Sequence, residues 1–322
     1  MEGLADCVLR DVLTRVGGYD GAVTEFVRVS GSLLPPRTFR RICPELDNAS
    51  RTTAGTPVLV QLLGSDPECL AENAAQLATL LPAGIDLNFG CPAPTVNRHG
   101  GGAMLLDDPA LLNRIVSAVR RAVPVAIPVS AKMRLGISDT DKALDCAQAL
   151  DAGGASSLVV HARTKDECYR PPAHWEWVAR IRESVGVPVV ANGEVWTPED
   201  YAQCRVVSGC EDVMIGRGAV SDPFLVRRIK TPGSGHIDHS AEWDELKPLL
   251  TEFWRQVQTR VIPGHAPGRL KLWLNSLRRS FVDAEALYWA IRPLRRIDEM
   301  NRTLMQHGVP LSHATLRTLS EA

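Results

Sequence analysis

The chain has 322 residues, of which 45% are hydrophobic and 23% are charged, and its formal net charge is −1. This is the composition of an ordinary globular protein with an ample core, and the length suits one large α/β barrel or two domains. No stretch approaches the roughly 20 apolar residues of a membrane span, and the first residues lack a signal-peptide pattern, so we expect no membrane partner.

The distribution of charge and cysteine indicates the kind of partner and compartment. Residues 1–240 carry a net charge of −4, whereas residues 241–322 carry +3. A basic segment on an acidic body points towards a polyanionic partner.

The eight cysteines are scattered without a CxxC pair. We therefore expect no disulfide framework, no metal site and a reducing, cytoplasmic location for a monomer.

Short β-rich runs recur along the first three quarters of the chain, each followed by a segment with helical periodicity. The predicted strands are 22–29, 57–64, 85–90, 128–135, 157–163, 188–193 and 212–218. Helix-like segments include 67–80, 109–122, 141–152 and 198–206. Strand–helix alternation predicts parallel βα units, and the apolar, β-branched strands suit a sheet that is buried on both faces.

These seven units predict an α/β fold, a (β/α)8 TIM barrel whose first strand is missing from the chain, because a closed barrel of this type has eight strands. Residues 1–17 have the pattern of a loop that enters a helix, with no strand before it. Taken literally, the barrel would be unclosed, with unpaired edges on the two flanking strands.

A helical domain is predicted to follow the barrel. Residues 231–240 are rich in Gly, Ser and Pro and predict a linker. Beyond them the periodicity is helical only, over 242–261, 267–281 and 284–300. We expect a barrel domain over 1–230, the linker over 231–240 and an all-helical domain over 241–322.

The stretch 85–106 carries the most distinctive chemistry. Asp86 and Asn88 are two residues apart and share one face of a strand. Cys91 follows the strand end, Pro92 sets a turn, and the glycines at 100–102 permit close backbone approach or a positive φ. The arrangement is that of a reactive thiol presented by a loop, although an isolated cysteine is more often a buried structural residue.

Polar side chains gather at the ends of successive predicted strands, where barrel enzymes place their active sites. They are Gln61, Asn88, Cys91, Lys132, Arg134, His161, Arg163, residues 192–194 and residues 216–218. A single strand lysine or histidine is more often structural, and it is the repetition at one end that favours an active site. The last two segments fall where barrels bind phosphate, with Arg217 adding a charge, and Lys132 is placed to face the electron-rich edge of a flavin.

These motifs resemble those of the flavin-dependent tRNA-dihydrouridine synthases. The similar segments are IDLNFGCPAPTVNRHGGGAMLL, VSAKMRLG, VVHARTKDECYR, VVANGEV and DVMIGRGA. TEFVRV, RRICPEL and RLKLWLNSLRR are most similar to the bacterial DusC branch, which acts on the uridine at position sixteen. The resemblance implies an oxidoreductase with a TIM barrel, FMN as cofactor, NADPH as reductant and tRNA as substrate.

The resemblance also implies roles for single residues. Cys91 matches the proton donor, which protonates the fifth carbon of the uracil after reduced flavin delivers hydride to the sixth. An ordinary thiol, with a pKa of about 8.5, suits that role because it is mostly protonated at neutral pH. The positions that match FMN ligands are Met1, Gln61, Lys132, His161, Asn192, Gly193, Glu194, Gly216 and Arg217.

The positions that match tRNA contacts are Arg28, Asn88, Tyr169, Arg269, Lys271, Trp273, Arg278 and Arg292. Asn88 would bind the uracil edge, and Tyr169 and Trp273 would stack. On a helix, Leu270, Leu274, Leu277 and Phe281 form one apolar stripe, whereas Lys271, Asn275 and Arg278 lie on a different face. Attraction to phosphate is the favoured interpretation of that second face, and a merely solvated face is the alternative.

The match departs from the family at its start. The family's chain opens with a strand that ends in an Ala-Pro-Met corner against the flavin. Here Met1 takes the place of that methionine, and the strand and the proline are absent. We therefore expect the true start to lie upstream, and roughly ten restored residues to raise thermal stability and flavin content.

Three other functions remain open on the sequence alone. A different FMN barrel could act on a free pyrimidine, and it would not need the residues after 229. A lyase could use Lys132 to form a Schiff base without flavin. A tRNA-binding protein or chaperone would keep its function if Cys91 were replaced.

Overall fold

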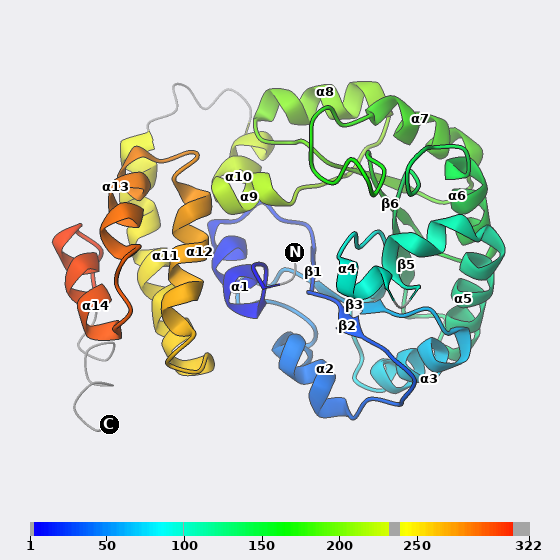
Figure 1. Cartoon of the computed structure of the whole chain (residues 1–322), viewed down its shortest axis with the longest axis horizontal. Helices are drawn as coiled ribbons and strands as arrows, with labels where there is room; N and C mark the ends of the chain where they lie inside the picture. The colour runs from blue at the N-terminus through cyan, green and yellow to red at the C-terminus, as the bar shows by residue number, and fades with distance from the viewer. Residues whose placement is uncertain (1–2, 99, 232–238, 312–322) are drawn as a thin grey trace. The chain divides into compact units, whose positions relative to one another are not determined.

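The computed structural model describes residues 3–98, 100–231 and 239–311. Contacts between Cα atoms divide them into two compact units. The barrel unit contains residues 19–216, and the helical unit contains residues 3–18, 217–231 and 239–311. Figure 1 labels the elements of both units.

The barrel unit is built on one parallel sheet. Its order is β1–β3–β4–β5–β6–β7–β8, and β2 also pairs with β3. The strands are β1 Ala22–Val23, β2 Val27–Arg28, β3 Val58–Leu63, β4 Ile85–Phe89, β5 Val129–Arg134, β6 Leu158–His161, β7 Val189–Asn192 and β8 Val213–Met214. This parallel βα arrangement confirms the predicted fold class.

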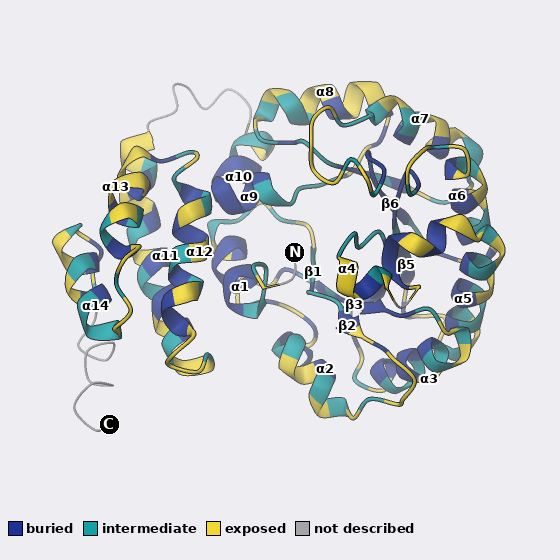
Figure 2. Cartoon of the chain, viewed as in Figure 1, coloured by how far each residue is buried: buried dark blue, intermediate teal, exposed yellow. Residues whose placement is uncertain are grey.

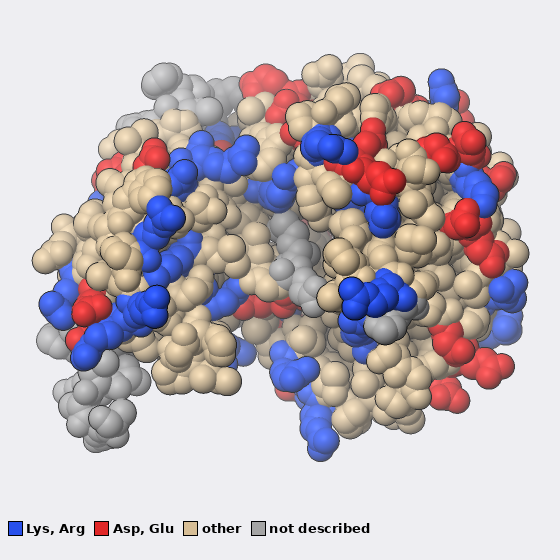
Figure 3. All heavy atoms as spheres, viewed as in Figure 1, with Lys and Arg blue, Asp and Glu red and all other residues tan. Residues whose placement is uncertain are grey.

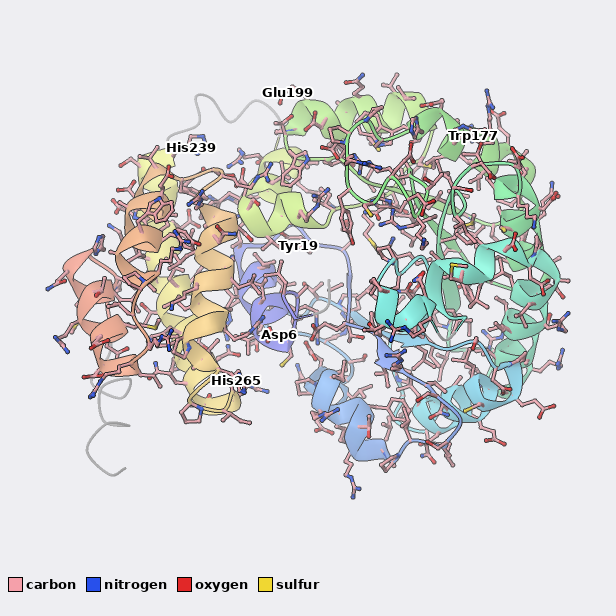
Figure 4. All side chains as sticks on the ribbon, in the orientation of Figure 1. Asp6, Tyr19, Trp177, Glu199, His239 and His265 are labelled. Atoms are coloured by element: carbon pink, nitrogen blue, oxygen red, sulfur yellow. The ribbon has the colours of Figure 1, made fainter. Side chains whose placement is uncertain are left out.

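Helices follow most of these strands and form an arc around the outside of the sheet (Figure 1). They are α2 Pro36–Ile42, α3 Pro67–Ala78, α4 Pro94–Asn97, α5 Pro109–Ala122, α6 Ala143–Ala152, α7 Trp175–Ser184 and α8 Pro198–Ser208, with 3₁₀ turns at Pro44–Asn48 and Gly102–Asp107. Trp177 of α7 and Glu199 of α8 lie on this helical rim (Figure 4).

The starts of these helices follow from local sequence. Asp66 precedes α3 and accepts a hydrogen bond from the backbone N–H of Cys69, and Asp108 does the same for Leu111 at the start of α5. Thr197 and Asp200 form a reciprocal capping box at α8. Each of these three helices also has proline in its first turn, where the missing N–H costs nothing.

The two faces of the sheet differ sharply in chemistry. On β4, Ile85, Leu87 and Phe89 are at most 1% exposed and belong to the apolar core between sheet and helices. The alternate residues Asp86 and Asn88 point to the opposite face, because side chains alternate along a strand. Figure 2 shows the inward-facing sides of the surrounding helices as buried. The sheet therefore carries one apolar face against the helices and one polar inner face.

Two details of the sheet differ from the expected strands. The expected strand 22–29 consists of two short strands, β1 and β2, which pair with successive parts of β3. The sheet order ends at β1 on one side and at β8 on the other, and no residue that the structure describes supplies a strand between them. Met1 and Glu2 lie outside the described residues.

The helical unit contains α1 Cys7–Val16, α9 Arg217–Ser221, α10 Leu225–Lys230, α11 His239–Arg260, α12 Ala266–Leu277, α13 Val282–Ile291 and α14 Ile297–Gln306. Asp6 caps α1, His239 is the first residue of α11, and His265 is the N-cap residue of α12 (Figure 4). Leu270, Leu274, Leu277 and Phe281 are at most 1% exposed. Leu270, Leu274 and Leu277 confirm the predicted apolar stripe, whereas Phe281, also buried, lies beyond the end of α12 as the N-cap residue of α13.

The unit boundaries differ from the expected division at residue 230. Residues 3–18 and 217–231 belong to the helical unit, because α1 packs against α11 and α9 packs against α12. Most of the expected linker, residues 232–238, lies outside the described residues, and α11 already begins at His239. The predicted helix 284–300 is wrong as one element: α13 ends at Ile291 and α14 begins at Ile297. Pro293 explains the break, since it lacks an N–H and crowds the preceding turn.

Candidate active site and cationic surface

A chain of hydrogen bonds crosses the polar face of the sheet through β3, β4 and β5. Gln61 Nε2 donates to Asp86 Oδ2 at 2.7 Å, and Asn88 Nδ2 donates to Gln61 Oε1 at 2.7 Å. Ser130 Oγ donates to Asp86 Oδ1 at 2.7 Å. The register explains this proximity, because Asp86 is the direct partner of both Gln61 and Ser130. The structure thus brings Gln61 and Asn88, an expected FMN ligand and an expected tRNA contact, into direct contact.

Lys132 and Asn192 form a second polar pair on the same face. Lys132 Nζ donates to Asn192 Oδ1 at 3.0 Å, and Asn192 Nδ2 donates to the carbonyl of Met214 at 2.8 Å. Burial, followed by the nearby positive charge of Arg134, lowers the pKa of Lys132 to about 8, while Asp86 acts in the opposite direction. The amine is therefore held in place and is poised to change charge near neutral pH.

The loop after β4 holds Cys91 by its backbone. The carbonyl of Cys91 accepts hydrogen bonds from the Ala103 N–H at 3.1 Å and from Asn97 Nδ2 at 2.9 Å. Gly102 has φ +61, and a Cβ there would lie 2.7 Å from that carbonyl oxygen. Only glycine fits this close approach. Cys91 itself is half-buried, and the loop fixes its position through the backbone.

The loop after β6 is anchored by Arg134. Its Nε donates to the Gly90 carbonyl at 2.9 Å, and its Nη1 donates to the carbonyls of Thr164 and Cys168, both at 2.9 Å. Arg134 also lies 5.3 Å from the ring centroid of Tyr169, and that ring meets His161 edge-on at 6.0 Å. One buried guanidinium therefore ties the cysteine loop to the loop that presents Tyr169 beside His161, the last residue of β6.

The segment after β7 is held in an unusual conformation. Gly193 has φ +120, and Glu194 has φ +60. Residues other than glycine rarely adopt such positive φ values. Glu194 accepts hydrogen bonds from Arg163 Nη2 and from Trp196 Nε1, and Arg163 is fully buried. The carboxylate of Glu194 is thus engaged within the protein, which leaves the backbone of this segment as the part that could contact a ligand. Gly216 closes the barrel unit, and Arg217 opens α9 in the helical unit.

The family motifs assign no role to Asp86, Ser130 or Arg163. The signal for Asp86 and Ser130 was available in the alternation of β4 and β5, where every second residue of each strand is polar. The pairing of Arg163 with Glu194 joins residues 31 apart in sequence. No local pattern reveals such a contact.

Cations are spread over the surface of the helical unit (Figure 3). Arg269 is committed to the N-terminal segment: it donates to the carbonyls of Gly3 and Leu4 and pairs with Asp6 at 2.7 Å. Lys271 donates to the carbonyl of Leu294. Partial burial, followed by the charge of Arg295, lowers the pKa of Lys271. Two of the predicted tRNA contacts therefore also hold the unit together.

Arg278 and Arg292 instead flank an exposed tryptophan that the sequence motifs did not identify. Trp289 is 48% exposed, and the guanidinium carbons of Arg278 and Arg292 lie 5.2 and 4.8 Å from its ring centroid. Tyr288 lies beside it, with ring centroids 5.4 Å apart. Exposed aromatic rings among cations are typical of surfaces that stack on nucleic-acid bases.

The expectation that Trp273 stacks on a base is wrong. Trp273 is fully buried, its Nε1 donates to the carbonyl of Val220 at 3.2 Å, and its ring packs on Phe253 with centroids 4.6 Å apart. Its place on α12 puts it in the core beside Leu270 and Leu274. Tyr169 is 47% exposed and keeps an accessible ring. Arg28 is exposed, and its guanidinium donates to the carbonyl of Thr95 in α4 at 2.7 Å.

The described residues contain neither a membrane-spanning helix nor a cluster of metal ligands. No helix within 3–98, 100–231 and 239–311 combines the length and apolar character needed to cross a bilayer. Over the same ranges, no three His, Cys, Asp or Glu side chains cluster as metal ligands would.

Solved structures with a similar fold define the class of this chain. Histamine dehydrogenase from Rhizobium matches with a TM-score of 0.54 and 14% identity, over 81% of this chain and 48% of that one. The chain therefore spans about half of that protein. Morphinone reductase matches with a TM-score of 0.51 and 12% identity, over 74% of this chain and 84% of that one. At such identities the likeness shows an α/β-barrel fold alone.

Sequence comparison then identifies the family. The profile described as "Dihydrouridine synthase (Dus)" matches residues 1–261. The chain is 62% identical to the tRNA-dihydrouridine(16) synthase of Ralstonia nicotianae, over 92% of this chain and 90% of that relative. It is 59% identical to the enzyme of the same name from Cupriavidus necator, over 96% and 95%. The chain belongs to the dihydrouridine synthase family of oxidoreductases, which confirms the resemblance seen in its motifs.

Proposed function

We propose that the chain is an FMN-dependent enzyme that reduces the 5,6-double bond of the uridine at position 16 of tRNA, with NADPH as reductant. The observation that carries this proposal is the 62% identity to a relative named for that reaction, together with the half-buried Cys91 in the loop after β4. We place the reaction in the cytoplasm, where the eight cysteines of this chain would stay reduced.

The donors on the inner face fit the polar edge of a flavin ring. Lys132 supplies an ammonium, Gln61 and Asn192 supply amides, and His161 supplies an imidazole, all nearly or partly buried. The ring carries carbonyl oxygens and nitrogens that such donors can bind. Residues 193–194 and 216–217 would bind the phosphate, mostly through backbone N–H groups and Arg217. FMN, when bound, supplies the hydride. Met1, the remaining expected ligand, lies outside the described residues.

The chain's own contribution to the chemistry is orientation and a proton. Asn88 binds the polar edge of the uracil, and Cys91 Sγ donates its proton to the fifth carbon after the sixth has been reduced. The thiolate that remains is reprotonated from water before the next turnover. Arg134 keeps the cysteine loop and the Tyr169 loop together, since it donates to carbonyls in both. The half-buried site excludes enough water to keep these contacts directional.

The tRNA would be held by cations and aromatic rings on both units. On the barrel unit these are Arg28 and Tyr169, which are both exposed. On the helical unit they are Arg278 and Arg292, with Arg269 and Lys271 shaping the surface. Salt-dependent attraction to phosphate would supply affinity, and the rings would supply contacts to unstacked bases.

The decisive experiment combines cofactor identification with a substrate assay. The purified protein should show a flavin spectrum and release FMN on denaturation, and with NADPH it should form dihydrouridine at position 16 of tRNA that lacks this modification. A colourless protein that gains no activity with added FMN would overturn the proposal. Activity on free uridine, equal to that on tRNA, would instead favour a pyrimidine reductase.

A further inference from the structure

We propose that Asp86 is the positioning residue of this site, and that it sets the direction of two consecutive amide side chains, Gln61 and Asn88. The inference rests on the proposed function, because these two amides are the ones assigned to the flavin and the uracil. Asp86 itself is 1% exposed and lies in register with Gln61 and Ser130. It therefore acts through its neighbours.

The hydrogen-bond chain has a definite direction because both of its ends are fixed. At one end the Asp86 carboxylate accepts hydrogen bonds from Gln61 Nε2 and from the Ser130 hydroxyl. At the other end the backbone N–H of Gly90 can only donate, and it donates to Asn88 Oδ1 at 2.9 Å. Between them Asn88 Nδ2 donates to Gln61 Oε1. Reversing either amide would place two donors or two acceptors in contact.

This direction decides what the two amides offer to a ligand. Gln61 Nε2 and Asn88 Nδ2 each have two hydrogens and use one of them within the chain. Each amide therefore keeps one N–H that no described residue accepts. Flavin and uracil rings both carry carbonyl oxygens on their polar edges, so two oriented donors match them. With the amides reversed, oxygens would replace these donors.

Burying Asp86 is costly, so a role in packing alone does not account for it. Burial raises the pKa of its carboxyl, and Ser130, Gln61 and the charge of Lys132 oppose that effect. An apolar residue of similar size would avoid the desolvation penalty entirely. The carboxylate instead contacts Gln61 and lies near Lys132, and these are both residues assigned to the flavin.

The test compares Asp86→Leu with Asp86→Asn. Leucine removes the acceptor, so Gln61 is released and FMN should bind the apoprotein roughly 10–100-fold more weakly, as expected for an unsatisfied buried donor. Asparagine can turn its oxygen to Gln61 and its NH₂ to the Ser130 hydroxyl, so it should keep FMN affinity within roughly threefold of wild type. Fluorescence titration with FMN measures both variants, and melting curves report their folding.

Ser130→Ala is the matched control. It removes a partner of the same carboxylate but leaves the bond to Gln61, so FMN affinity should stay near that of wild type. Equal dissociation constants for Asp86→Leu and Ser130→Ala would overturn the inference while leaving the proposed function intact. A wild-type protein that binds no FMN would overturn the proposed function itself.

A charge exchange keeps the proposal testable if Asp86→Leu does not fold. Gln61→Glu alone places two carboxylates in contact and should weaken FMN binding by roughly tenfold or more. Adding Asp86→Asn restores a donor opposite the introduced carboxylate. That carboxylate still accepts the hydrogen bond from Asn88, and the total charge equals that of wild type. The double variant should recover melting temperature over the single one, because the contact between the two side chains is restored. Its FMN affinity should stay weak, because the introduced carboxylate has no N–H to offer the ring. A double variant that melts no higher than the single one would contradict the orienting role of Asp86.

Discussion

The inner face of the barrel unit and the surface of the helical unit use charge in opposite ways. On the inner face, Asp86 and Asn192 are buried and Lys132 is half-buried, and their hydrogen bonds of 2.7 to 3.0 Å join partners on different strands of the sheet. On the helical unit, Arg278 and Arg292 are accessible and lie against an exposed aromatic ring. Hydrogen bonds between buried polar groups are strong and directional. Interactions of single surface charges are weak, screened by salt and tolerant of geometry.

The difference indicates two kinds of ligand. A small planar ring has to be oriented to within a fraction of an ångström, and only a rigid, desolvated set of donors can do that. A long polyanion needs many adaptable contacts whose sum gives affinity. Substitutions on the inner face should therefore change flavin binding or chemistry, and substitutions on the helical surface should change tRNA affinity alone.

The largest effect is expected for Cys91→Ala. Loss of a general acid typically reduces turnover by roughly 10²–10⁴-fold. The dissociation constants for FMN and tRNA should stay within about threefold of wild type, because the loop is held by the backbone carbonyl of Cys91 and by Gly102. Single-turnover reduction of tRNA measures the step. Cys69→Ala, a half-buried cysteine at the start of α3, is the control, and equal rates for both variants would refute the assigned role.

Arg163→Met should have the next largest effect, on stability. Arg163 is fully buried and donates to the Arg170 and Pro172 carbonyls and to Glu194. Removing one partner of a buried ion pair costs about 3 kcal/mol or more in free energy of unfolding. Urea denaturation checks this value. Arg180→Met, at an exposed residue stacked on Trp177, should cost less than about 1 kcal/mol, and a similar loss for both would contradict the assigned difference.

The third prediction concerns pH. Lys132 is protonated below its pKa of about 8 and neutral above it, so affinity for the anionic cofactor should fall as pH rises through that value. In the absence of flavin, the effect of Lys132 on the free energy of unfolding has the opposite dependence on pH. In the unfolded chain Lys132 keeps its proton up to about pH 10.5, so its contribution to stability rises between pH 8 and 10.5. FMN titrations and melting curves over this range test both signs. Lys132→Arg should remove the inflection, because guanidinium stays charged.

The smallest effects should come from the helical surface. Trp289→Ala removes a stacking ring and should weaken tRNA binding by roughly tenfold, without altering FMN affinity. Arg292→Ala should reduce the slope of log Kd against log salt by about 0.7–0.9. Val282→Ala, on the same helix and 86% exposed, is the matched control. A loss of FMN affinity in Trp289→Ala would break the proposed separation between the two regions.

Local sequence was sufficient for much of this architecture. Five of the predicted strands appear as single strands at nearly the expected places, because apolar alternation and turn residues are short-range signals. The predicted strand 212–218 is reduced to Val213–Met214, and its last residues already belong to α9, which begins at Arg217. The same holds for the apolar stripe of α12 and for the cysteine loop with its glycines. The family motifs likewise depend on contiguous residues, and sequence comparison confirms them.

Tertiary structure decided what depends on pairing between distant residues. The burial of Trp273 was not predictable from its neighbours, because an aromatic residue beside Lys271 fits either a surface or a core until the packing partners are known. The exposure of Trp289 between Arg278 and Arg292, the pairing of Arg163 with Glu194, and the chain from Ser130 through Asp86 to Asn88 all join separate elements. The sequence by itself determined which residues could carry the chemistry, since motif and periodicity are local. Only the register of the sheet and the packing of the helices decided which of them meet, because those contacts form between segments that are far apart in the chain.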